Sequence, residues 1–158
     1  MTRPRPAQLD SPLVPKLMRL ASRATVWLYK KTGGAIGGKW RVGSAFPSGV
    51  PVGLLVTRGR KSGEPRTTPV LYLADRERLV IVASQGGLPK HPQWYLNLQA
   101  EPLVELQIGR HARRMRARTA TPAERAQLWP RLVELYRDFE TYQSWTERVI
   151  PVVICEPN

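Results

Sequence analysis

The sequence has few of the residues that build disulfides and metal sites. Of its 158 residues, one is a cysteine (Cys155) and two are histidines (His91 and His111). A lone cysteine cannot form an internal disulfide and is typical of a reducing compartment. These three residues are also too few for a structural zinc site, which takes four ligands, so we expect no metal.

Long apolar runs are missing as well. No stretch approaches the ~18 consecutive apolar residues that a membrane-spanning helix needs, and the N-terminus lacks the residue order of a secretory signal. We therefore expect a cytoplasmic protein. Its apolar fraction, 42%, is enough for the core of a chain of this length.

Acidic residues are scarce. The chain has 25 Lys and Arg against 12 Asp and Glu, which gives a net charge of +13. Such an excess indicates an anionic partner, which could be a nucleic acid, an acidic membrane surface, or a phosphorylated or carboxylated ligand. Residues 1–41 contribute much of it, with nine basic residues and one acid.

Residues 1–41 are predicted to form a basic amphipathic helix and a glycine-rich loop. Ser11-Pro12 is typical of a helix start and Gly33-Gly34 of a helix end. Apolar residues recur between them at helical spacing, namely Leu13, Leu17, Leu20, Ala24, Trp27 and Leu28. Such a helix either packs on the domain with a solvated basic face, or lies peripherally on the anionic inner face of the cell membrane.

Residues 50–158 are predicted to form the main domain. Short apolar and β-branched segments predict strands over 52–57, 67–73, 79–84, 103–108, 112–119 and 150–155. Helices are expected over 91–100 and 121–136, the second with a capping box at Thr121 and a kink or a shifted start at Pro130. Residues 33–51 show no period and are expected to form a loop. This order predicts an α+β fold, a barrel of about six antiparallel strands with flanking helices.

Two segments could bind an anionic, flat ligand. The turn over residues 57–66 holds two glycines, a serine and four cations, which suits a cradle for phosphate or carboxylate, although ordinary exposed turns have similar compositions. Ser84-Gln85-Gly86-Gly87 joins a strand to a helix and either admits a ligand closely, with Ser84 as a donor, or is a plain connection. The arginines of 113–118 could contact RNA, but no aromatic residues for base stacking accompany them.

The residues alone leave the function open, because no nucleophile with a base or isolated pair of carboxylates is evident. Chemistry would therefore require an organic cofactor. Four motifs in order, however, resemble the deazaflavin-dependent nitroreductase family: TRGRKSGEPRTTP (57–69), VASQGG (82–87), PQWYLNL (92–98) and YQSWTER (142–148). The similarity extends to residues 11–13 and 150–157 and is interrupted near residues 43–49.

The resemblance implies a split β-barrel of the FMN-binding, flavin-reductase type and the reduced deazaflavin coenzyme F420, whose phosphate and oligoglutamate tail match the cationic composition. It places the following residues on the phosphate and tail side: Arg60, Lys61, Ser62, Arg66, Thr67, Thr68, Pro69, Val70 and Leu71. It places the following along the ring and its side chain: Val82, Ala83, Ser84, Gln85, Gln93, Trp94, Tyr95, Leu96 and Asn97.

The resemblance also implies hydride transfer to a menaquinone-like quinone or to a nitroaromatic acceptor. Tyr136, Phe139, Tyr142 and Trp145 would wall the acceptor pocket, and Ser84 would act catalytically as a hydrogen-bond donor. Phe139 stands where a mycobacterial member has tyrosine, which argues against nitroimidazole reduction. Gln85 stands where that member has lysine, which removes one cation near the cofactor.

Several alternatives remain at this point. The chain could bind F420 or a lipid without catalysis, or use FMN in place of the deazaflavin. An RNA-binding module would also explain the charge, but we expect no nucleic acid as partner. Related split barrels pair as dimers, so a homodimer is a further expectation.

Overall fold

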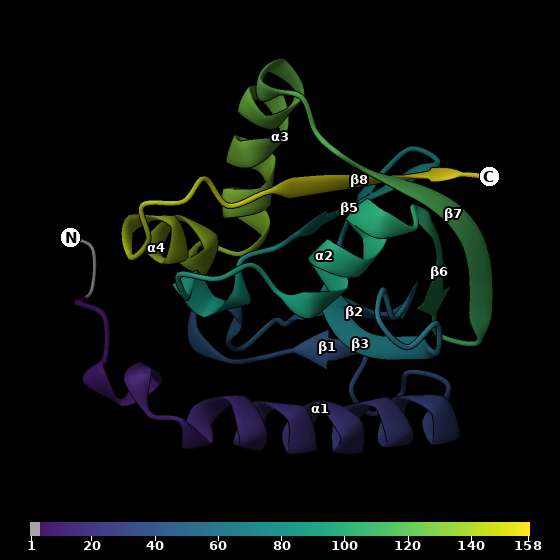
Figure 1. Cartoon of the computed structure of the whole chain (residues 1–158), viewed down its shortest axis with the longest axis horizontal. Coiled ribbons are helices and arrows are strands. Elements are labelled where there is room, and N and C mark those ends of the chain that lie inside the picture. The colour runs from purple at the N-terminus through teal and green to yellow at the C-terminus, as the bar shows by residue number, and fades with distance from the viewer. Residues whose placement is uncertain (1–3) are drawn as a thin grey trace.

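The computed structural model describes residues 4–158, and its strands curl into a barrel with helices around it (Figure 1). Neighbouring strands are antiparallel, in the order β1-β2-β6-β7-β8-β5-β4. β3 lies outside this order and also pairs with β2. The strands are β1 (Lys39–Trp40), β2 (Val50–Arg58), β3 (Pro65–Leu71), β4 (Leu73–Asp75), β5 (Arg78–Val82), β6 (Leu103–Ile108), β7 (His111–Thr119) and β8 (Val152–Pro157).

The barrel closes through β3 and β4, which follow each other with only Tyr72 between them. β3 pairs with β2 along its whole length, whereas β4 pairs with β5. The single strand predicted over 67–73 is thus wrong in detail, because it starts earlier and is divided. A strand that passes from one neighbour to the next around a small barrel must bend, and the bend interrupts its pairing. If β3 and β4 are counted as one bent strand, all six predicted strands are present.

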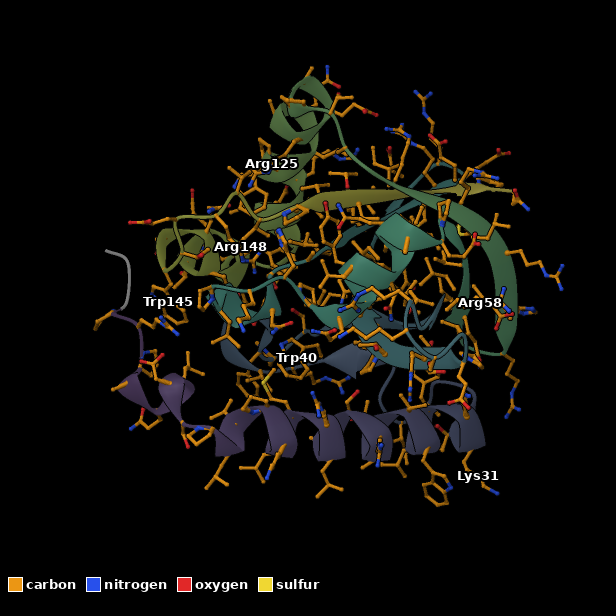
Figure 2. All side chains as sticks on the ribbon, in the orientation of Figure 1. Lys31, Trp40, Arg58, Arg125, Trp145 and Arg148 are labelled. Carbon is orange, nitrogen blue, oxygen red and sulfur yellow. The ribbon has the colours of Figure 1, made fainter. Side chains whose placement is uncertain are left out.

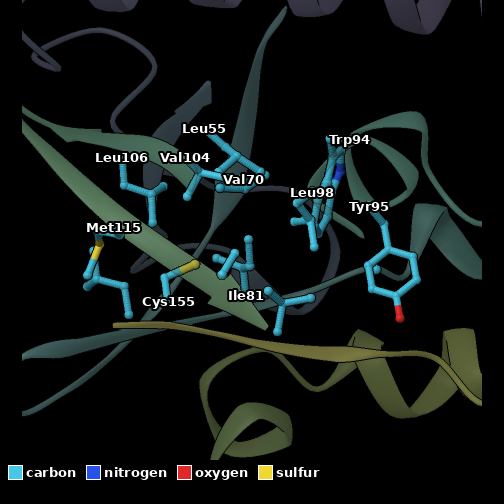
Figure 3. Packing of buried hydrophobic residues seen from close by; sticks show 14 residues of the cluster. Leu55, Val70, Ile81, Trp94, Tyr95, Leu98, Val104, Leu106, Met115 and Cys155 are labelled. Atoms are coloured by element: carbon cyan, nitrogen blue, oxygen red, sulfur yellow. The ribbon is translucent and has the colours of Figure 1, made fainter. Parts of the chain in front are cut away.

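The barrel interior is a hydrophobic core closed by α2 (Gln93–Ala100) (Figure 3). Leu55, Ile81 and Leu106 from the strands are fully buried there, and α2 adds Trp94, Tyr95 and Leu98. Cys155 also lies in this core, and burial raises the pKa of its thiol to about 12. The thiol is therefore held in its unreactive, protonated form.

A second core forms between the outer face of β5 and β8 and the helices α3 (Pro122–Leu135) and α4 (Asp138–Ser144). The predicted capping box is present, since Thr121 Oγ1 accepts from the Glu124 N–H at 3.2 Å and Glu124 Oε1 accepts from the Thr121 N–H at 3.1 Å. α3 starts directly after it and continues through Pro130, so the predicted shift of its start is wrong.

The helix α1 (Leu13–Thr32) runs along the base of the barrel (Figure 1). Tyr29 anchors it: the ring is 1% exposed, its hydroxyl donates to Val52 O at 3.1 Å, and the oxygen accepts from the Gly109 N–H at 2.8 Å. The apolar stripe identified in the sequence lies on the opposite side, where Leu13, Leu17, Leu20 and Trp27 are 60–67% exposed. α1 thus packs on the domain through one face and presents a second apolar face to solvent. None of the helices formed by residues 4–158 is long and apolar enough to cross a membrane.

Residues 33–51 were expected to be loop, yet they contain a short strand and a 3₁₀ turn. β1 pairs with the start of β2, Lys39 opposite Pro51 and Trp40 opposite Val50. The turn η2 (Gly43–Ala45) follows and buries Ala45 among the residues of α3 and α4. We call residues 39–46 the strap. A two-residue strand has no period of its own, so no pattern in the sequence could reveal it.

Candidate active site

The turn between β2 and β3 is fixed against the start of α2 by one arginine. Arg60 donates from its backbone N–H and from Nη1 to Asn97 Oδ1 at 3.2 and 3.0 Å, and from Nη2 to Gln93 Oε1 at 2.9 Å. The buried Asn97 in turn donates to Thr57 Oγ1 at 3.2 Å. Three residues predicted for the cofactor site, Arg60, Gln93 and Asn97, therefore meet at one place.

This turn, the cationic hairpin (residues 58–66), has little negative charge to balance it. The acceptors of Arg60 are neutral amide oxygens, and the exposed Lys61 has no side-chain partner within the described chain. Arg66 lies 3.4 Å from Ser62 Oγ and 3.9 Å from the carboxylate of Glu64, a pair too exposed to neutralise much charge. The donors of the hairpin therefore fit an anionic group.

The second predicted segment is held by Arg148. Its guanidinium donates to three backbone carbonyls, Leu88 O at 2.9 Å, Ala83 O at 3.2 Å and Ser84 O at 2.7 Å. Its fourth contact, 3.1 Å, is with Nδ1 of His91. Because arginine cannot accept a hydrogen bond, this Nδ1 must be unprotonated. Burial and the charge of Arg148 lower the pKa of His91 accordingly.

The segment that Arg148 holds, residues 83–88, packs against α4 through η3 (Gln85–Gly87). Gln85, Gly86 and Gly87 all have positive φ angles, of 45°, 61° and 76°. A Cβ on Gly87 would lie 2.7 Å from Tyr142 O, so only glycine allows η3 (Gln85–Gly87) to approach α4 this closely. Within residues 4–158 the Ser84 hydroxyl makes no hydrogen bond, which leaves it available to a ligand.

The four aromatic residues predicted for the acceptor pocket do lie together, but at different depths. Tyr136 and Phe139 are 2% and 4% exposed and pack in the second core, whereas Tyr142 and Trp145 are half-buried. Ring centroids are 6.1 Å apart for Tyr136 and Tyr142 and 5.7 Å apart for Tyr142 and Trp145. Only the outer two rings present a surface, and the inner two support them from behind.

Trp40 joins this cluster and was not predicted. Its indole Nε1 donates to Tyr136 Oη at 3.3 Å, and Tyr136 Oη lies 3.1 Å from Tyr142 Oη. Figure 2 shows Trp40 above α1, with Arg148 and Trp145 beside α4. The sole hint in the sequence is a tryptophan inside a glycine-rich stretch, which by itself points to no site.

The other predicted residues fall into two groups. The side chains of Val70, Ala83, Trp94 and Tyr95 belong to the barrel core, so they pack against the protein and offer no ligand surface. A second group is half-buried along β3, β5, η3 and α2: Thr67, Thr68, Pro69, Leu71, Val82, Gln85 and Leu96. Two hollows in the surface lie elsewhere, one beside β6 and β7 and one between the β4–β5 turn and α3.

Two groups of contacts adjoin along the chain at residues 91–93, and we call them together the strip. Arg60 binds Gln93 in the first group. In the second, Arg148 binds His91 and the Ser84 carbonyl, on the segment that reaches α4 at Gly87. The strip is cationic at one end and aromatic at the other. Its shape and donors suit a long ligand with an anionic end and a flat end.

Comparison with known proteins identifies the family. The sequence model of the F420H(2)-dependent quinone reductases matches residues 21–157. Rv3178 of Mycobacterium tuberculosis H37Rv, provisionally named an F420H(2)-dependent quinone reductase, is 49% identical over 118 residues, which are 75% of this chain and 99% of its own. Among solved structures, an F420-H2 dependent reductase (FDR-A) has a TM-score of 0.63 and 40% identity over 67% of this chain and 94% of its own.

Another solved structure, described as a domain-swapped dimer, has a TM-score of 0.65 and 32% identity over 90% of this chain and 99% of its own. These matches confirm the resemblance, the barrel fold and the deazaflavin cofactor predicted from the four motifs. The chain belongs to the F420H(2)-dependent quinone reductase family, and is an oxidoreductase that uses coenzyme F420.

Proposed function

We propose that the protein reduces a menaquinone-like quinone with hydride from reduced F420, along the strip described above. The observation that carries this proposal is that an uncompensated cationic hairpin and a half-buried aromatic cluster are joined to two adjacent hydrogen-bond networks, one around Arg60 and one around Arg148, which adjoin along the chain at residues 91–93. When bound, F420 supplies the hydride. The residues of the chain hold the two reactants, exclude water between them and provide hydrogen-bond donors.

The cofactor would lie with its anionic end at the hairpin. Lys61 has a free ammonium group, and Arg60 keeps three guanidinium N–H groups beyond the two bonded to Asn97 and Gln93. Gln93 and Asn97 then act mainly by fixing Arg60. The flat end would reach Ser84, whose hydroxyl donates to the oxygen on which charge develops in the acceptor.

The acceptor would contact Tyr142 and Trp145, the outer pair of aromatic rings. A quinone needs only hydrogen-bond donors at its carbonyl oxygens, and both Ser84 and Tyr142 can supply them. Phe139 is buried and has no hydroxyl, so it offers nothing to a nitro group. We therefore favour a quinone over a nitroaromatic acceptor.

The test combines turnover with cofactor binding. Purified protein mixed with reduced F420 and menadione should show reoxidation of the deazaflavin by absorbance, and no turnover with any quinone would refute the proposal. Lys61→Ala should weaken F420 binding about fivefold, with a smaller effect at high salt, because one exposed charge on an anion is worth about 1 kcal/mol. Lys16→Ala, on α1, is the matched control and should bind F420 as the wild type does.

We further propose that α1 holds the protein on an anionic lipid surface. The stripe of Leu13, Leu17, Leu20 and Trp27 faces away from the barrel, and α1 carries five basic residues and no acid. An exposed apolar stripe with flanking cations is the pattern of a helix that lies in the lipid headgroup region. A quinone acceptor dissolves in the same bilayer, so this position would bring enzyme and substrate together.

Vesicle sedimentation tests the lipid proposal. The protein should bind vesicles that contain phosphatidylglycerol and bind pure phosphatidylcholine weakly. Replacing Leu13, Leu17 and Leu20 by serine should lower the affinity about a hundredfold, since each partly inserted leucine contributes about 1 kcal/mol. Leu103→Ser, an exposed leucine of β6, is the control. If the triple variant still binds, or if sedimentation shows that the stripe instead joins two copies of the chain, the lipid surface is the wrong partner.

A further inference from the structure

The strap is attached to the first turn of α4 by a reciprocal pair of hydrogen bonds. The Ser44 N–H donates to Asp138 Oδ2 at 3.1 Å, and the Asp138 N–H donates to Ser44 Oγ at 3.1 Å. Gly43 has a φ of 62°, and a Cβ there would collide with Asp138 Oδ2, so a side chain at this position would break the attachment. Since β1 also pairs with β2, the strap is fixed at both ends, and Trp40 has a defined place.

The hydrogen-bond chain from Trp40 has only one possible direction. An indole N–H can donate but cannot accept, so Tyr136 Oη receives the bond from Trp40. Tyr136 is 2% exposed and must place its own proton on an acceptor, and Tyr142 Oη, at 3.1 Å, is the one within reach among residues 4–158. Tyr142 therefore accepts from Tyr136, and its own proton is left for another group.

The shifts of the phenol pKa values agree with this direction. Burial, followed by the hydrogen bond that it donates to Tyr142, raises the pKa of Tyr136 far above its usual value, while the bond from Trp40 acts the other way. Burial raises the pKa of Tyr142, and the bond that it accepts from Tyr136 opposes the rise. Both phenols stay protonated at neutral pH, so Tyr142 remains a donor.

We propose that Trp40 is a positioning residue. It acts through Tyr136 to direct the hydroxyl proton of Tyr142 towards a carbonyl oxygen of the quinone. This inference rests on the proposed quinone function. It is independent of the hairpin end of the strip. Ser84 lies on the segment that contacts Tyr142 at Gly87, so both hydroxyls have a proton to offer to a carbonyl compound, which can only accept.

Simple packing would be the alternative role for Trp40, but its surroundings do not favour it. Trp40 is 41% exposed and belongs to neither core. Its N–H group, in contrast, meets the most buried phenol of the cluster. The indole N–H, and not the ring, should therefore account for most of what Trp40 contributes to the site.

Trp40→Phe separates the two roles because it keeps a ring and removes the donor. Without the N–H, Tyr136 and Tyr142 can exchange donor and acceptor roles, so the affinity of the apo protein for menadione should fall about five- to tenfold. Tyr136→Phe should have a similar effect, and the double variant should be no worse than either single one, as expected for residues of one chain. F420 affinity should stay unchanged. Trp27→Phe, on α1, is the matched control.

A second readout does not depend on quinone binding or on turnover. In protein with ¹³C-labelled tyrosine rings, the NMR signals of Tyr142 should shift in Trp40→Phe and stay in place in Trp27→Phe. Unchanged Tyr142 signals, unchanged menadione affinity, or effects of Trp40→Phe and Tyr136→Phe that add in the double variant would each overturn the proposal. If instead the wild type binds no menadione, the proposed quinone function is wrong. The proposed role of Tyr142 as a hydrogen-bond donor to the quinone is then wrong as well, whatever the effect of Trp40→Phe.

Discussion

Arg148 is the side chain on which the placement of Ser84 depends most directly. Its guanidinium makes three hydrogen bonds to the backbone between Ala83 and Leu88 and a fourth to His91. No carboxylate pairs with it among these contacts. The segment it holds includes Gln85 with a φ of 45°, a conformation that is costly for a residue other than glycine and that the surrounding structure must enforce.

Replacing Arg148 by methionine keeps the bulk of the stem and removes every donor. A hydrogen bond to a charged group is worth about 1.5–3 kcal/mol, but the four share one half-buried side chain and do not add fully. We expect a loss of about 3–5 kcal/mol in the free energy of unfolding, against a typical total of about 5–15 kcal/mol. At about 2–4 °C per kcal/mol, the melting temperature should fall by roughly 10 °C.

Thermal and urea unfolding followed by circular dichroism measure this effect. Arg148→Lys should recover part of the stability, since an ammonium group reaches one or two of the carbonyls. Arg116→Met, at an exposed position of β7, is the control and should change stability by less than about 0.5 kcal/mol. A loss below about 1 kcal/mol in Arg148→Met would refute the reasoning, and would mean that packing of Gly87 on α4 holds the segment alone.

The same cluster predicts a pH effect of known sign. The pKa of His91 is lowered in the folded protein, so folding favours the neutral ring. The stabilisation is complete above the unfolded pKa of about 6.5 and is lost as the pH falls towards the lower folded pKa. In Arg148→Met this loss should shrink, because the neighbouring charge that helps to lower the pKa is gone.

Two further predictions concern other anchors of the fold. Tyr29→Phe should cost about 1–3 kcal/mol in urea unfolding, because it leaves a backbone N–H of the β6–β7 turn without its acceptor, and an unchanged free energy of unfolding would contradict this. Hydrogen bonds, first of all from Arg118, lower the pKa of Glu124 to about 2, so stability present above pH ~4.5 should be lost as the pH falls towards 2. Glu124→Gln should remove this acid-dependent loss, whereas Glu134→Gln, exposed and without an ion pair within residues 4–158, should keep it.

The barrel was predictable because its strands are punctuated by turns. The segments over 52–57, 79–84, 103–108 and 112–119 alternate or run apolar between Gly, Pro and Asp, and each became a strand of the ring. The division of β3 from β4 was not predictable, since residues 67–73 are continuously β-forming. They are divided because the chain changes its pairing partner at Tyr72, and only the closure of the barrel requires this change.

The sequence motifs predict which residues to consider for the site, and they do not tell how deeply each residue is buried. A motif identifies Trp94 and Asn97 equally well, but only packing tells that the first closes the barrel core while the second fixes Arg60. Arg148 was noticed as part of a motif and was assigned no role. An arginine that binds main-chain carbonyls leaves no acidic partner in the sequence to reveal it. The strap was missed for a related reason, since its contacts join residues about a hundred positions apart.

The three regions to which we assign functions are all fixed to one strand, β2, and this limits how truncated variants can be interpreted. The start of β2 pairs with the strap at Val50, its middle packs under α1 at Val52 and Leu54, and its end leads through Thr57 to the cationic hairpin. Removing α1 would expose the buried middle of β2, so a truncated chain would lose stability along with any lipid binding. Because the exposed stripe and the face that carries Tyr29 lie on opposite sides of α1, point substitutions in the stripe can separate the two effects. A deletion cannot, and a loss of quinone reduction in a truncated chain would say nothing about membranes.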